Sequence, residues 1–154
     1  MHSLYYFLHI GSLAIWFGGL LSLALVLYTL NKRGGSQETE GIVRSLITIV
    51  NWLLNPSALI VMVSGLMMML NLGLMGQETA FWLRFMQDTG SLIVLLSIGL
   101  ITFYGNRFKK KVLNQAGADN AKLRKKMLAN YVRLMAGSAV LVLGVVLVVS
   151  LKIA

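Results

Sequence analysis

Residues 4–30 read LYYFLHIGSLAIWFGGLLSLALVLYTL and contain no lysine, arginine, aspartate or glutamate. A helix needs about 20 mainly apolar residues to cross the hydrocarbon core of a bilayer, and this stretch is longer than that. Three further apolar stretches follow, at about 45–74, 82–106 and 127–151. A helix satisfies its own backbone hydrogen bonds in lipid, and the alternation typical of strands is absent. We therefore predict an all-α integral membrane protein, with four transmembrane helices in an antiparallel bundle that forms a single domain over residues 1–154.

The composition agrees with a membrane protein and excludes several other classes. Of the 154 residues, 57% are hydrophobic and only 12% are charged, about half the roughly 25% of charged residues in soluble domains. A disordered chain and an ordinary soluble enzyme are both excluded by these values. The chain has no cysteine, so disulfides, thiolate zinc sites and iron–sulfur clusters are excluded as well. The first stretch lacks a basic leader, so we expect it to remain in the mature protein.

The basic residues gather in two of the three connections between the apolar stretches. Twelve of the 14 lysines and arginines lie in or beside these two connections: Lys32, Arg33, Arg44, Arg107, Lys109, Lys110, Lys111, Lys122, Arg124, Lys125, Lys126 and Arg133. Positive charge marks the cytoplasmic side of a membrane protein. We therefore expect both connections in the cytoplasm, both termini outside, and a multi-pass location in the cytoplasmic membrane.

The net charge of +9 could also indicate nucleic-acid binding. The basic run 109–126 has no interleaved aromatic residues and no recognition motif, so we expect no nucleic acid. Basic loops beside the cytoplasmic leaflet attract anionic lipid by about 1 kcal/mol per residue. The expected partners are therefore the lipid bilayer and anionic lipid at these loops, while a homo-oligomer or a larger membrane complex stays open.

The second apolar stretch contains the single proline, Pro56. Arg44, Thr48 and Asn51 precede it at helical spacing and form one polar stripe. A proline inside a helix removes one backbone hydrogen bond and frees a carbonyl near Trp52, which predicts a kink at Pro56. Two interpretations stay open: an amphipathic helix that bends at Pro56 into the membrane span, or one long kinked helix.

Two histidines stand on one face of the first stretch. His2, His9 and Trp16 recur every seven residues, and Ser12 and Gly19 extend the same stripe. A polar side chain inside a bilayer is expected either to have a hydrogen-bond or charge partner or to belong to a functional site. For His9 three interpretations are open: a neutral imidazole bonded to a hydroxyl or carbonyl of another helix, a ligand of a metal or a haem iron, and a proton relay.

Methionine is abundant, with nine residues in the chain. The expected topology places five of them in the same outer half as His9: Met67, Met68, Met69, Met75 and Met86. A thioether is a soft ligand that favours Cu(I), and one methionine with one histidine can also complete the axial pair of a haem. Methionine is also a flexible filler of apolar space, and three consecutive residues cannot all face one site. The sequence does not choose among these side chains.

Arg84 and Asp88 lie four residues apart at the start of the third stretch, as the two members of an ion pair on one helix face would. The pair would either anchor the helix end or orient the ligands of a site. The sequence shows neither paired intramembrane carboxylates nor an HExxH zinc motif. His2 and His9 share one helix face and cannot clamp one iron from both sides. We assign no catalytic residue and leave enzymatic activity undecided.

The first stretch resembles a known group of membrane proteins. Leu8-His9 followed by Trp16-Phe17-Gly18-Gly19-Leu20 resembles the first helix of the copper-resistance protein D (CopD) group and is similar to that of HemJ-type proteins. Further similarity to both groups covers Arg44, Asn55-Pro56, Gly65-Leu66 and Trp82. Both groups commonly carry a lysine after the tryptophan of the third helix, where this chain has Arg84.

The resemblance implies two different functions. CopD-like proteins are associated with the passage or acquisition of copper at the membrane. HemJ-type proteins bind haem b and oxidise protoporphyrinogen, and the haem-binding role of their first-helix histidine would carry over to His9.

We therefore hypothesise a small membrane protein that binds or passes copper near its outer face, with His9 as the central ligand. The other residues assigned to the site are Met68, Met69 and Met86 as soft ligands, His2 at the entrance, Trp16 and Gly19 as walls, and Arg84 with Asp88 at the rim. One alternative is a haem-b protein with His9 as axial ligand. The other is a non-catalytic accessory subunit of a membrane complex.

Overall fold

The computed structural model describes residues 2–33, 37–71, 73, 81–113 and 121–151, and all the secondary structure in these ranges is helical. The elements are α1 (His2–Arg33), α2 (Gln37–Ile49), η1 (Val50–Leu54), α3 (Asn55–Asn71), α4 (Phe81–Phe85), η2 (Met86–Gly90), α5 (Ser91–Phe108), η3 (Lys109–Leu113) and α6 (Ala121–Leu151), where η denotes a π-helical turn. Four stretches of helix are long and apolar enough to cross a membrane, at Ser3–Lys32, Glu40–Asn71, Leu83–Lys111 and Lys122–Leu151. The prediction of an all-helical chain with four such helices is confirmed.

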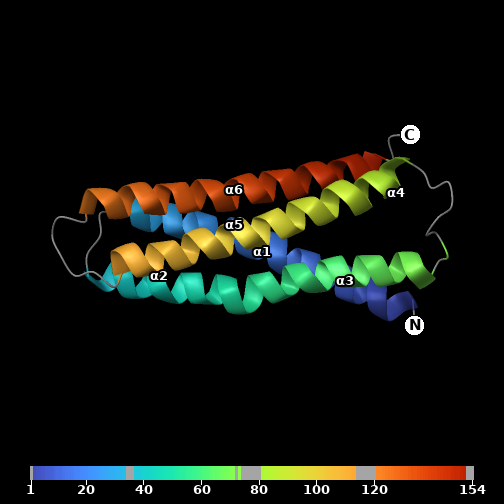
Figure 1. Ribbon diagram of the computed structural model, residues 1–154, viewed down its shortest axis with the longest axis horizontal. Coiled ribbons are helices and arrows are strands. Elements are labelled where there is room, and N and C mark those ends of the chain that lie inside the picture. Colours follow the sequence, from blue (N-terminus) through green and yellow to red (C-terminus); the bar gives the residue numbers. More distant parts are fainter. Residues whose placement is uncertain (1, 34–36, 72, 74–80, 114–120, 152–154) are drawn as a thin grey trace.

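The helices form an elongated bundle in which each long helix runs most of its length (Figure 1). α1 packs mainly against α3 and α6, and α5 packs against α6. α3 and α5 also contact each other, and the described parts of α1 and α5 have no comparable contact, so α1 and α5 lie diagonally across the bundle. The end of α1, the starts of α2 and α6, and η3 gather at one end (Figure 1). This end carries Lys32, Lys109–Lys111 and Lys122–Lys126, and we call it the basic end.

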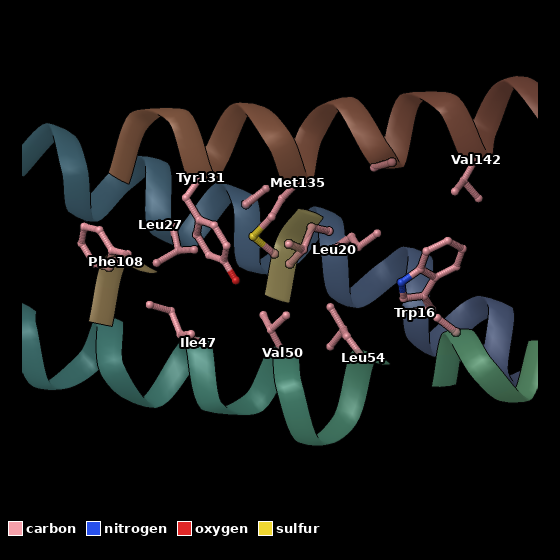
Figure 2. Packing of buried hydrophobic residues seen from close by; sticks show 14 of the residues in the cluster. Trp16, Leu20, Leu27, Ile47, Val50, Leu54, Phe108, Tyr131, Met135 and Val142 are labelled. Atoms are coloured by element: carbon pink, nitrogen blue, oxygen red, sulfur yellow. The ribbon is translucent and has the colours of Figure 1, made fainter. Parts of the chain in front are cut away.

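The bundle is apolar outside as well as inside. Its core is a cluster of buried side chains from α1, α2, η1, α3, α5 and α6, among them Trp16, Leu20, Leu54, Tyr131 and Met135 (Figure 2). Large apolar side chains also cover the surface, and Phe7 is 71% exposed and Trp52 81% exposed. A soluble monomer rarely exposes apolar surface of this extent. The exterior is therefore suited to lipid.

The second long helix runs without a break from Gln37 to Asn71, which is compatible with both interpretations of Pro56. Its irregularity precedes Pro56, in the π turn of η1. There the backbone N–H of Asn55 donates to the carbonyl of Val50, five residues earlier. Pro56 has no N–H to give to the carbonyl of Trp52, and widening the preceding turn is a common way for a helix to continue past such a residue.

α5 approaches its neighbours closely at Gly105. A Cβ atom added there would lie 3.1 Å from Cγ2 of Ile47 and 3.3 Å from the hydroxyl of Tyr131. Figure 2 shows the Tyr131 ring extending from α6 toward Ile47 and Val50. The absence of a side chain at Gly105 therefore lets α2, α5 and α6 meet at one level.

Replacing Gly105 with leucine is expected to destabilise the folded protein by about 1–3 kcal/mol, the usual cost of forcing extra volume into a packed core. The matched control is Gly99→Leu on the same helix, because a Cβ at Gly99 would meet nothing within 4 Å. Unfolding of both variants in detergent, followed by circular dichroism, measures the difference. Equal losses in the two variants would contradict the close packing at Gly105.

Candidate functional site

His9 of α1 lies against α3, and its ring is held there by hydrogen bonds. Its Nδ1 atom lies 2.9 Å from the carbonyl oxygen of Val61 and 3.2 Å from Oγ of Ser64. A carbonyl oxygen only accepts hydrogen bonds, so the proton of the neutral imidazole lies on Nδ1. The hydroxyl of Ser64 donates in turn to the carbonyls of Ile60 and Val61, and its oxygen can accept from His9. The lone pair of the imidazole is therefore on Nε2.

Gly65 makes room for this ring. A Cβ atom at Gly65 would lie 3.2 Å from Cε1 and 3.4 Å from Nδ1 of His9. Val61, Ser64 and Gly65 are spaced three and four residues apart, so they form one face of α3. The imidazole rests on that face, and the backbone of α3 itself supplies the hydrogen-bond acceptor.

These contacts bear directly on the interpretations of His9. The structure shows the bonds to a hydroxyl and a carbonyl of another helix that the first interpretation predicted. The same arrangement is also the usual one for a metal-binding histidine, which donates its second ring N–H to a carbonyl, a carboxylate or water. The contacts therefore fit both a packed histidine and a ligand that is held in place.

The methionines assigned to the site lie on two different helices. Met68 and Met69 follow Ser64 and Gly65 by one helical turn on α3, with Met68 half-buried and Met69 buried. Met86 is half-buried at the start of η2, which packs against α6 on the far side of the bundle from the α1–α3 contact. Of the candidate thioethers, those of Met68 and Met69 therefore share a helix with the partners of His9.

A metal site built from several acidic or imidazole ligands is not present in the described part of the chain. No group of three or more His, Cys, Asp or Glu side chains there could hold a metal ion. A site at His9 built from the described residues would therefore contain fewer than three ligands of these types and would need thioether or backbone ligands as well.

The residues assigned as walls take part in close packing. Trp16 is only 2% exposed and belongs to the apolar core. A Cβ at Gly19 would lie 2.9 Å from Cδ1 of Leu54, so Gly19 receives a side chain of η1. The side chains of His2 and Trp82 and all of Met75 lie outside the described residues.

The predicted ion pair between Arg84 and Asp88 is wrong. Both side chains are exposed, and the only ion pair found among the described residues joins Arg124 to Glu40. The physical reason is exposure: an ion pair between solvent-exposed side chains contributes little free energy, so four-residue spacing alone does not hold Arg84 and Asp88 together.

Comparisons of this chain with protein-family models, with curated proteins and with solved structures gave no match. The likeness of the first helix to the CopD and HemJ groups stays a prediction from its residues. Fold and site together define a four-helix protein with a lipid-compatible exterior and one histidine fixed between two of its helices.

Proposed function

We propose that the protein is a multi-pass protein of the cytoplasmic membrane that binds or passes copper near its outer face through His9. The four helices would form an antiparallel bundle across the bilayer, with the basic end in the cytoplasm and both termini outside. The apolar exterior and the concentration of lysines at one end support this orientation. His9 lies on the half of α1 farther from the basic end, which corresponds to the outer half.

The observation that carries the proposal is the hydrogen bond from Nδ1 of His9 to the carbonyl of Val61. It orients the ring and favours the tautomer with a proton on Nδ1, which would leave Nε2 as the nitrogen that binds a metal. Thioether groups of Met68 and Met69 lie one turn along the same helix. Imidazole nitrogen with thioether sulfur is a soft donor set that suits Cu(I). The residues present thus fit a copper ion without a thiolate or a carboxylate.

Replacing His9 with glutamine is expected to reduce the affinity for Cu(I) at least tenfold, which corresponds to about 1.4 kcal/mol. The glutamine amide can still donate to the Val61 carbonyl, so the fold should persist while the imidazole is lost. Titration with Cu(I) in the presence of a competing chelator measures the affinity. Met68→Leu should also weaken binding, and Met67→Leu, at an exposed neighbouring position, is the matched control. Unchanged copper stoichiometry and affinity in His9→Gln would overturn the proposal.

A second candidate is a haem-b protein, because an axial histidine would use the same free Nε2. The buried side chains of Ser12, Trp16 and Leu20 fill the α1 face on the basic side of His9. A macrocycle would therefore have to lie toward the other end of the bundle, whereas a single ion needs much less space. The visible spectrum of the purified protein before and after dithionite separates the two candidates. A Soret band that disappears in His9→Gln would favour haem over copper.

A further inference from the structure

Three pairs of polar side chains join the second long helix to the third, away from His9. Lys109 Nζ donates to Thr48 Oγ1 at 2.9 Å, Asn51 Nδ2 to Asn106 Oδ1 at 3.5 Å, and Asn55 Nδ2 to Thr102 Oγ1 at 2.8 Å. Residue numbers rise along one helix as they fall along the other, so the pairs are successive levels of one line. We call these six residues the polar seam.

The two ends of the polar seam differ in how exposed their side chains are. Asn55 and Thr102, the pair farthest from the basic end, are half-buried and joined at the short distance given above. At the basic end Thr48 and Asn106 are exposed, and Lys109 is half-buried. Groups outside the protein can therefore reach the seam more easily near the basic end, at Thr48 and Asn106, than at Asn55 and Thr102.

The basic end of the seam has unused hydrogen-bond donors. The ammonium of Lys109 carries three N–H donors, of which Thr48 takes one. Asn106 uses its amide oxygen in the contact with Asn51, and its two amide N–H donors have no partner among the described residues. A ligand at this position would therefore be an acceptor.

Lys109 has no ion-pair partner among the acidic side chains that the structure describes. Of the acidic side chains that the structure describes, Glu40 pairs with Arg124, and Asp88 lies in η2 at the opposite end of the bundle. The acceptor that suits this place is therefore an anion.

We propose that the basic end of the polar seam binds the headgroup of one anionic phospholipid. The phosphate would contact Lys109 beside Thr48, and a glycerol ester carbonyl would accept from the amide of Asn106. These two residues are three positions apart, or about 4.5 Å along a helix. Basic sites between transmembrane helices on the cytoplasmic side are a common place for such headgroups.

The order of chemical groups along the seam favours a lipid over a free phosphate ion. A phospholipid presents its phosphate, then its esters and then its acyl chains. The protein presents the ammonium of Lys109, then the amide of Asn106, and then an apolar exterior in which Phe103 and Trp52 are exposed. Free phosphate would match only the first of these three levels.

The test compares two neighbouring lysines. The protein is stripped of lipid in a mild detergent and titrated with phosphatidylglycerol, and the bound lipid is counted by native mass spectrometry. We expect one tightly bound molecule, with Lys109→Gln weakening its affinity five- to tenfold and Lys110→Gln by less than twofold. Glutamine keeps a donor for Thr48, and Lys110 is an exposed residue of the same charge in the same π turn. Asn106→Ala, at an exposed position, should weaken binding about threefold with all charges retained.

Three results would overturn the proposal. Equal losses in Lys109→Gln and Lys110→Gln would mean diffuse attraction of the basic end to lipid. Equal binding of phosphatidylcholine would mean that the charge of the lipid is not recognised. Displacement of the lipid by millimolar inorganic phosphate would identify a free phosphate site. The copper proposal is unaffected by each outcome, since the polar seam does not include His9 or its partners.

Discussion

Replacing Trp16 with alanine is expected to destabilise the folded bundle by about 3 kcal/mol, the lower end of the range for such changes in soluble proteins. Trp16 is 2% exposed and is the largest of the fully buried side chains. Its removal forfeits many van der Waals contacts and leaves a cavity between α1 and its neighbours. The transfer component of the loss is smaller than in water, because lipid tails are as apolar as the core. Reversible unfolding in mixed detergent micelles measures the change.

The matched control is Trp52→Ala. Trp52 lies in η1 with 81% of its surface exposed, so its removal opens no cavity and should change stability by no more than about 0.5 kcal/mol. A comparable loss in the two variants would show that Trp16 does not pack in the core. Trp16 lies on the same stripe of α1 as His9. That result would therefore also mean that this stripe does not face the interior of the bundle.

Hydropathy located the long helices but not their ends. The third and fourth apolar stretches were predicted at about 82–106 and 127–151, whereas the third helix continues through η3 to Leu113 and α6 begins at Ala121. The extra turns carry lysines and arginines, which lower hydropathy but are good helix formers. The long stems of these side chains also let a helix extend past an apolar region while their charges reach water. A hydropathy pattern therefore reports the apolar part of a helix and not its length.

The π turns show a second limit. Pro56 predicts an irregularity in the second helix, and the π turn of η1 lies next to this residue. The turn Met86–Gly90 contains no proline, and nothing in its pattern of polar and apolar residues distinguishes it from an α-helical turn. The absence of an ion pair between Arg84 and Asp88 was not predicted either, because the spacing rule says which side chains can meet and not whether exposed ones do.

The candidate site, too, could be predicted only in part from the sequence. The stripe through His9 could be recognised because spacing within one helix fixes a common face. Its partners could not, because Val61 and Ser64 meet His9 only through the register between α1 and α3. That register depends on packing along the whole contact. The polar stripe of Thr48 and Asn51 was likewise visible in the sequence, while its partners on the third helix were not.

The register between α1 and α3 depends on the small size of Gly65. A Cβ there already lies 3.2 Å from Cε1 of His9, so an alanine needs a shift of a few tenths of an ångström. The branched side chain of leucine would occupy the space of the ring itself. The imidazole would then have to leave the Val61 carbonyl, and its hydrogen bond, worth about 0.5–1.5 kcal/mol, would be lost together with its orientation.

Gly65→Leu is therefore expected to lower the affinity for Cu(I) more than tenfold, which corresponds to more than about 1.4 kcal/mol, and Gly65→Ala to lower it only slightly. Gly11→Leu is the control, since Gly11 stands two residues from His9 on α1 and a Cβ there would meet nothing within 4 Å. Chelator competition and detergent unfolding are measured on all three variants. A loss of stability in Gly65→Leu without a loss of copper affinity would make His9 a packing residue and move the copper site elsewhere. Unchanged stability and unchanged affinity together would contradict the contact between His9 and α3, because the ring and a leucine side chain cannot share that space.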